Sequence, residues 1–343
     1  MTVANLPGVR VIVDGKDVTP TLYARVAGST RQRLVSLSLT EKRGGEADQL
    51  DLVIDDSDGR VDLPRAGARI VLAFGWSQGV GVQVGLVEKG SFVVEDVEHA
   101  GPPDLLTIRA RAADFTGDIR QRRERSWHDT TLGAVVGDIA RANGLEPHVA
   151  PDIAAVPVES LAQSREGDIA FVRRLGRAHD AIASVKDGKL VVMPIGAGVT
   201  PSGRPLPAVT LHRRDGDRHS FSRQKPEEAG TVEAGWHDRK GAKRQIESHG
   251  DGGKTRRLSR TYATKEAAQA AAKAEHGRAA RAPSKLDLTL ALGRPDIYPD
   301  QRVTVAGIKP AIDAIAWLVD EVQHDIGERG FTTRLKLDTA PTK

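Results

Sequence analysis

Short runs of alternating apolar and polar residues fill the first 115 residues. Successive side chains of a strand point to opposite faces, so this period of two predicts half-buried β-strands. Turn residues separate the runs, and Asp14-Gly15 is a strong hairpin signal because glycine accepts the positive φ of a primed turn. We therefore expect a small β-barrel or sandwich here. Its clearest strands are predicted at residues 9–13, 34–40, 49–54, 69–74, 90–97 and 105–110.

The pattern changes to helical spacing after Arg120. Apolar residues between 132 and 140 line one helical face, and Asn143-Gly144 follows as a stop signal. A second set, between 169 and 178, predicts another helix. Residues 181–193 hold two apolar runs around an Asp-Gly turn, which indicates a β-hairpin. The middle of the chain is therefore expected to mix α and β structure.

Residues 194–207 are rich in proline and glycine and are the best linker in the sequence. Beyond them we expect a long exposed loop at 237–257 and an alanine-rich helix at 264–282. Strands are predicted at 220–222, 231–236, 286–292, 302–306, 314–324 and 331–337. The chain thus divides into a first β domain (1–115), a mixed α/β middle with its linker (116–205) and a second β domain with one added helix (206–343).

Composition narrows the classes of function. The 343 residues include no cysteine, which excludes disulfide scaffolds, thiolate metal sites and cysteine nucleophiles. The formal charge of +4 is too small to indicate nucleic-acid binding by itself. No apolar run approaches the roughly 18 residues of a spanning helix, so no membrane insertion is expected. The first residues lack a secretory signal pattern, so we expect a protein made and used without export by that route.

Several short motifs suggest chemistry, and each has a simpler explanation. Gly253-Lys254-Thr255 resembles the end of a phosphate-binding loop but lacks the required earlier glycine. The glycines at 79, 81 and 85 have the wrong spacing for a dinucleotide fingerprint and favour a glycine-rich hairpin. The acidic run 55–59 lacks the bidentate glutamate of a calcium loop. His212 and His219 form no metal-binding pattern. No catalytic, cofactor-binding or metal-binding residue is therefore assigned, and no cofactor is expected.

Residues 120–125 are the one basic run, with four arginines in the sequence RQRRER. Such a run could grip phosphates, but Glu124 interrupts it and no aromatic residues are interleaved for base stacking. A solvated linker or a protein interface is the favoured interpretation. The residues alone therefore indicate a multidomain, β-rich interaction or structural protein.

Several phrases follow one another along the chain: residues 11–18 (VIVDGKDV), 47–58 (ADQLDLVIDDSD), 90–97 (GSFVVEDV), 101–111 (GPPDLLTIRAR), 139–145 (IARANGL), 168–175 and 183–190 (ASVKDGKL). Trp127 with Thr131-Leu132 belongs to the same series, as does the end of the chain at 317–324 and 330–337. In this order, the phrases resemble the phage late control D family, the tail hub of contractile-tailed phages and of phage-derived particles.

The resemblance implies a trimeric ring in which each chain contributes two tube-like β-barrel domains. Such a ring matches a hexameric tail tube on one side and a trimeric spike on the other. The implied partners are two further copies of the chain, the spike protein, the tube protein or a tube initiator and other baseplate proteins. The implied location is the tail of a virion or a phage-tail-like particle, assembled in the bacterial host cytoplasm. No enzymatic activity and no specific nucleic-acid binding are expected.

Two other functions stay open at this stage. Residues 130–145 resemble the first helix of a LysM peptidoglycan-binding module, so the middle region could bind the cell wall. The arginines at 120–125 could instead serve a DNA-binding late-gene regulator, although no recognition helix is evident. Binding to purified peptidoglycan, or salt-sensitive binding to duplex DNA, would separate these alternatives from the hub.

Overall fold

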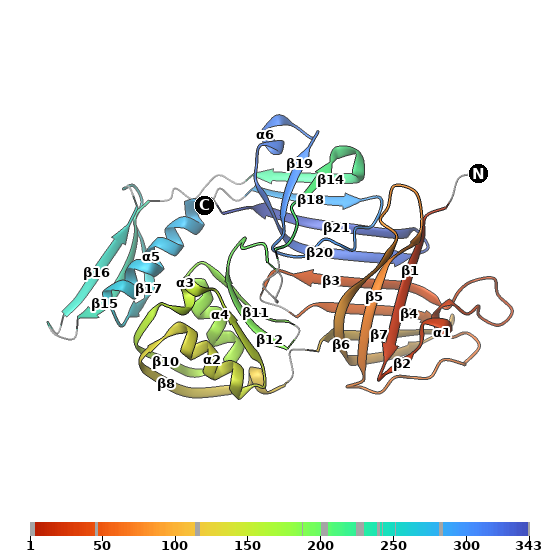
Figure 1. The fold of residues 1–343 in the computed structure, drawn as a ribbon, viewed down its shortest axis with the longest axis horizontal. Helices are drawn as coiled ribbons and strands as arrows, with labels where there is room; N and C mark the ends of the chain where they lie inside the picture. The colour runs from red at the N-terminus through yellow and green to blue at the C-terminus, as the bar shows by residue number, and fades with distance from the viewer. Residues whose placement is uncertain are drawn as a thin grey trace. The chain divides into compact units, whose positions relative to one another are not determined.

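The computed structural model describes residues 4–44, 47–113, 117–186, 188–199, 205–223, 230–238, 241, 243–250, 252–280 and 284–341. The chain divides into two compact units. Unit 1 comprises residues 1–115, 207–221 and 286–338, and unit 2 comprises residues 116–206, 222–285 and 339–343. Most of the regular structure is β-strand, as the alternating pattern predicted (Figure 1). No helix in the described part of the chain is long and apolar enough to cross a membrane.

The first half of unit 1 is an antiparallel set in which β3, β4, β7, β6, β5, β1 and β2 are neighbours in that order. Alternate residues point inward and are almost fully buried, such as Leu37 and Leu39 or Leu50 and Leu52. All six predicted strands are present here. The elements are β1 (Leu6–Val13), β2 (Lys16–Asp17), α1 (Thr19–Tyr23), β3 (Leu34–Lys42), β4 (Gln49–Asp55), β5 (Arg69–Gln78), β6 (Gly85–Ala100) and β7 (Leu105–Ala112).

The second half of unit 1 continues the same sheet through the antiparallel pairing of β20 with β3. Its own core is built around Trp317, Leu286 and Leu335, with Phe221 packed against it. The elements are β13 (Val209–His212), η2 (Arg213–Asp215), β14 (Gly216–Arg223), β18 (Ser284–Leu290), β19 (Arg302–Ala306), α6 (Pro310–Asp313), β20 (Trp317–Gly327) and β21 (Gly330–Thr339).

Together the two halves form one 13-stranded sheet with two cores. Its main path runs from β14 to β2, and β19 branches from β20 to pair with β13. Among the described residues, these pairings do not close into a ring. The mainly β fold class is therefore confirmed, whereas the two closed barrels expected from the resemblance stay a prediction.

Unit 2 begins with a two-stranded sheet, β8 with β10, and a three-stranded sheet of β11, β12 and β9. Both predicted helices are present, and the hydroxyl of Thr131 accepts a hydrogen bond from the Ala134 N–H at the start of the first. The elements are η1 (Gly117–Arg120), β8 (Arg122–Thr131), α2 (Leu132–Ala142), β9 (Glu146–Val149), α3 (Pro151–Ala154), β10 (Pro157–Gly167), α4 (Asp168–Ala178), β11 (Ala181–Lys186) and β12 (Lys189–Pro194).

A further α/β segment of unit 2 comes from residues that the sequence grouped with the second β domain. Strands β16 (Lys243–His249), β15 (Val232–Asp238) and β17 (Arg256–Tyr262) form a sheet that packs on α5 (Lys265–Ala280). Residues 222–285 thus belong to unit 2, and residues 206–343 are not one compact unit. Alternation along a strand reports burial of one face but not which neighbouring segment covers that face.

Strand β16 lies inside the exposed loop expected at 237–257. Its residues are almost all polar or charged and mostly exposed, so no apolar alternation marks it in the sequence. Backbone pairing with β15 creates the strand. The prediction of an exposed loop is therefore wrong at residues 243–249, because the backbone hydrogen bonds that join two strands do not require an apolar face.

Candidate assembly surface

Exposed aliphatic side chains gather at one corner of unit 1. Seven large hydrophobic side chains are exposed among the described residues, and four of them belong to the start of β1 and the β5–β6 connection. They are Leu6 (48% exposed), Val80 (67%), Val84 (57%) and Leu86 (44%). Single exposed aliphatics are ordinary, but a local group of them indicates a contact surface.

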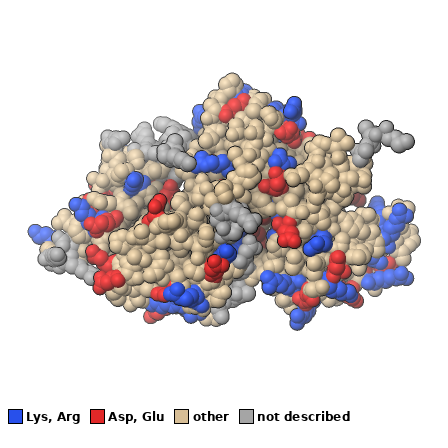
Figure 2. Space-filling view, viewed as in Figure 1, with Lys and Arg blue, Asp and Glu red and all other residues tan. Residues whose placement is uncertain are grey.

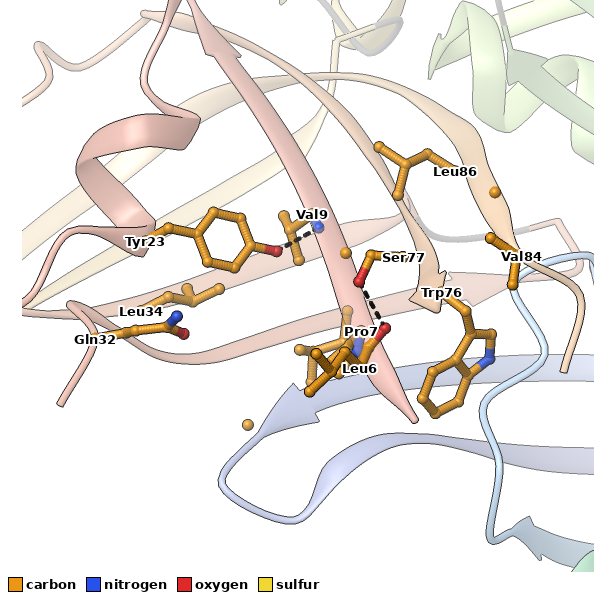
Figure 3. A pocket seen from close by; sticks show the side chains of 14 residues that line it. Leu6, Pro7, Val9, Tyr23, Gln32, Leu34, Trp76, Ser77, Val84 and Leu86 are labelled. Carbon is orange, nitrogen blue, oxygen red and sulfur yellow. Dashed lines mark hydrogen bonds between the residues drawn. The ribbon is translucent and has the colours of Figure 1, made fainter. Parts of the chain in front are cut away.

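Three of these side chains, Leu6, Val84 and Leu86, line a groove of about 540 Å³. Figure 3 shows Leu86 and Val84 on one side of the groove, Leu6 and Pro7 in front and Tyr23 with Leu34 on the other side. The groove is lined by Leu6, Pro7, Gly8, Val9, Tyr23, Gln32, Leu34, Trp76, Ser77, Val84, Gly85, Leu86, Ile326 and Gly327. Among the described residues that line it, Tyr23 has the only ionisable side chain, so the groove offers apolar contact rather than acid–base chemistry.

A glycine and one side-chain hydrogen bond fix the shape of the β5–β6 connection. A Cβ on Gly75 would lie 2.0 Å from the carbonyl oxygen of Gly85, so the two strands approach closely only without one. The Oδ1 atom of Asn5 accepts from the Val80 N–H at 2.7 Å. The predicted glycine-rich hairpin is confirmed by the antiparallel pairing of β5 with β6.

Side chains accept hydrogen bonds from backbone N–H groups on the outer edge of β1. Tyr23 Oη accepts from the Val9 N–H at 2.7 Å, and Thr19 Oγ1 accepts from the Val11 N–H at 2.9 Å. Burial raises the pKa of Tyr23, which favours the neutral hydroxyl. Because two of its N–H groups already have acceptors, this edge is poorly suited to strand pairing, and the adjacent aliphatic side chains are the available contact surface.

An ionic cluster of Glu41, Lys89 and His324 lies buried in unit 1. Lys89 Nζ lies 2.8 Å from Glu41 Oε2 and 3.9 Å from the ring centre of Tyr298. His324 Nε2 lies 3.4 Å from the same Glu41 oxygen, and His324 Nδ1 lies 3.0 Å from Thr333 Oγ1. The three charged or titratable groups come from β3, β6 and β20, so the cluster ties the two halves of the sheet together.

The acidic run 55–59, for which a calcium loop was disfavoured, makes its contacts within the chain. Asp58 pairs with the buried guanidinium of Arg33, whose hydrogen bonds hold the pKa of Asp58 well below its usual range. Asp55 accepts from Ser57, and Asp56 accepts from the Val61 N–H. In the described part of the chain, no three His, Cys, Asp or Glu side chains form a group able to hold a metal ion.

The basic run at 120–125 is not a linker. Residues from Arg122 onward form β8, and the alternate side chains of Arg123 and Arg125 face the fully buried Asp168 at 3.7 and 3.5 Å. Asp168 also accepts from Asn143 and Gln163, each at 2.8 Å. The linker interpretation was wrong because residues 122–125 belong to a strand, whereas the other interpretation, a protein interface, stays a prediction.

The remaining motifs lie on separate parts of the chain. His212 ends β13 and His219 lies within β14, while Gly253-Lys254-Thr255 precedes β17 without a helix after it. On the face drawn in Figure 2, Lys and Arg are interspersed with Asp and Glu. Sequence reasoning missed Val84 and Leu86, although two apolar residues beside a glycine-rich turn are a usable signal of an exposed contact.

The chain matches known proteins over most of its length. The family model described as "Phage tail baseplate hub (GPD)" matches residues 50–330. The chain is 38% identical over 354 residues to a probable baseplate hub protein of Escherichia phage 186, covering 91% of this chain and 90% of the relative. The chain belongs to the phage tail baseplate hub family. A probable baseplate hub protein of Escherichia phage P2 is also 38% identical, over 97% of this chain and 93% of its own length.

Solved structures share the fold of this hub family member at low identity. A tail protein of prophage MuSo2 from Shewanella oneidensis matches with a TM-score of 0.66 and 14% identity, over 96% of this chain and 98% of its own. A tail protein from Neisseria meningitidis gives the same TM-score and identity, over 97% and 96%. The resemblance to the late control D family is confirmed, and the protein's location is the tail of a phage or tail-like particle.

Proposed function

We propose that this chain is a structural hub whose copies form a trimeric ring between the tail tube and the spike. Membership of the baseplate hub family supports the role, and the curated relatives are aligned over nearly their whole length. The two β-rich halves of unit 1, each with its own core, are the candidates for the two tube-like barrels of each chain. Three chains would then supply six such elements facing the tube.

The observation that carries the proposal is the apolar groove of unit 1. Three exposed aliphatic side chains line the open groove, and leaving them in water costs roughly 25 cal/mol for each Å² of apolar area that stays unburied. A ring interface would bury them. The groove is therefore the surface that we assign to contact with a neighbouring copy, and no catalytic role is proposed.

The experiment is the solution mass by light scattering on a sizing column, for the chain alone and with the spike protein encoded nearby. The expected result is a trimer, or a monomer that becomes a three-to-three complex with the spike. The V84E and L86E variants should fall to monomers or lose the complex, because each would place a charge in the interface. L63E is the matched control, since Leu63 is 62% exposed and lies outside the groove.

A monomer that does not bind the spike protein would contradict the proposal. Unchanged assembly of both the V84E and the L86E variant would contradict it as well. The peptidoglycan alternative stays a prediction, to be tested by a pull-down on purified cell wall. The DNA-binding alternative is disfavoured, because Arg123 and Arg125 are directed at Asp168 and their side chains are only 32% and 24% exposed. Failure to bind duplex DNA at low salt would remove it.

A further inference from the structure

Unit 2 contains a second and larger cleft, of about 870 Å³, that the hub role does not use. Its walls are strand β10, the end of α4, strand β17 and the alanine-rich face of α5. On both strands the cleft is lined by consecutive residues, 157–162 of β10 and 260–262 of β17, and on the second side the lining continues into residues 263–264. A cleft lined by consecutive strand residues borders the edge of the strand rather than one of its faces, since side chains alternate between faces.

Both strands have an unpaired edge within the described residues. Strand β10 pairs only with β8, and β17 lies at the end of its three-stranded sheet with β15 as its only neighbour. The carbonyl of Ala162 on β10 accepts from Arg174 Nη2 at 3.3 Å, so a side chain from the cleft already bonds this edge. Unpaired strand edges offer N–H and C=O groups to an added extended chain.

The rest of the cleft wall is apolar and built from small side chains. Ala267, Ala270 and Ala271 of α5 line it together with Leu161 and Leu258. Helix α5 presents alanine at these positions rather than leucine, and its small side chains leave the space open. The cleft therefore has room for the alternate apolar side chains of an extended segment.

Arginines give one part of the cleft an excess of positive charge. Arg174 is paired with Glu166, whereas the Arg260 guanidinium has no ion pair within the described chain and only a ring contact with Tyr262 at 5.9 Å. Partial burial and the nearby charge of Arg174 lower the pKa of Arg260. A carboxylate beside Arg260 would relieve this repulsion. The acidic side chains that also line the cleft are Glu159, Glu266 and Glu275, and Glu275 pairs with Arg256 at 3.2 Å.

We propose that this cleft is a docking site for an extended segment of a partner protein, mostly apolar and carrying one carboxylate. The segment adds as a strand to the free edge of β10 or β17, places its alternate side chains against the alanines of α5 and its carboxylate beside Arg260. Backbone pairing supplies the affinity, and the apolar pockets and Arg260 supply the specificity.

The test uses three nine-residue peptides of alternating threonine and valine with glutamate, glutamine or lysine at the centre, each fluorescently labelled. Their binding to the full chain is measured by anisotropy, and amide exchange of the chain is followed by mass spectrometry. The glutamate peptide should bind most tightly and should slow exchange in β10 and β17. R260E should weaken the glutamate peptide about tenfold and favour the lysine peptide, because the local charge is reversed.

Two matched pairs of variants separate docking from unfolding. A270W should abolish binding by filling the cleft, whereas K273W places the same ring on the exposed face of α5 and should not. K243E, on the far strand β16, controls for R260E. Equal binding of the three peptides, unchanged exchange in both strands, or full binding by A270W would overturn the proposal. These measurements concern a cleft of unit 2, and they do not depend on the solution mass that tests the trimeric ring.

Discussion

Glu41 in unit 1 and Asp168 in unit 2 are both buried carboxylates, and the two are stabilised in opposite ways. Glu41 in unit 1 is neutralised by the ammonium of Lys89, which is fully buried under the ring of Tyr298. Asp168 in unit 2 accepts two neutral amide hydrogen bonds at 2.8 Å, and its arginine partners stay farther away and partly exposed. Unit 1 therefore depends on a matched pair of charges, whereas unit 2 depends on hydrogen-bond donors around a single charge.

The difference follows from the elements that supply the partners. Glu41 and Lys89 come from β3 and β6, which are not adjacent in the sheet, and they meet in a core beside Phe74, Phe331 and His324. Asp168 is the first residue of α4, where amides from the preceding strand and from the end of α2 can reach it. A helix N-terminus also favours negative charge, so a full counter-charge is less necessary there.

The largest expected effect is the loss of one partner of the buried pair. K89M leaves Glu41 charged and buried, so the free energy of unfolding of unit 1 should fall by about 3–5 kcal/mol. The measurement is chemical denaturation followed by tryptophan fluorescence. Adding E41Q to K89M should recover a large part of the lost stability, because the uncompensated charge of Glu41 is then removed. If the double variant is no more stable than K89M, the explanation by an uncompensated charge is wrong.

A smaller effect should appear on acidification through His324. Burial and the nearby Lys89 charge lower its pKa to about 4, against roughly 6.5 in the unfolded chain. The unfolded state therefore binds more protons between these values, and stability is lost as the pH falls from about 6.5 to 4. The loss should reach about 3 kcal/mol at the lower end. Glu41, Lys89 and Thr333 lie around this ring, and the charge of Asp325, the next residue of β20, also acts on it.

The check is the free energy of unfolding measured at several pH values in that range for the native chain and for H324Q. The glutamine variant keeps a polar side chain near Thr333 but cannot gain a proton. Its stability should fall less steeply with acidification. Parallel curves for the two proteins would show that another group causes the pH dependence.

The smallest effect should come from Asp168. D168N removes the charge while keeping the shape, and the new NH₂ group would face the amide donors of Asn143 and Gln163. We expect a loss of about 1–3 kcal/mol in unit 2 and little change in unit 1. Amide exchange by mass spectrometry would locate the loss. A destabilisation as large as that of K89M would contradict the contrast between the two carboxylates.

The sequence predicted elements better than it predicted their grouping. Alternation located all six strands of the first half of unit 1, and helical spacing located α2 and α4, because each pattern reports burial along one local element. It missed β16, which has no apolar face, and it misread β8 as a linker. The absence of a recognisable catalytic motif left the candidate assembly surface to be found from exposed side chains in three dimensions.

The sequence by itself determined the strand and helix periods, the turn glycines and the family resemblance, since all of these depend on residues near one another in the chain. Only the tertiary structure decided that residues 222–285 join unit 2, that Glu41 meets Lys89 and His324, and that Leu6 and Leu86 line one groove. Contacts between distant segments depend on sheet order and register, which period alone does not specify. For a structural hub, those contacts build the surfaces that we propose for assembly.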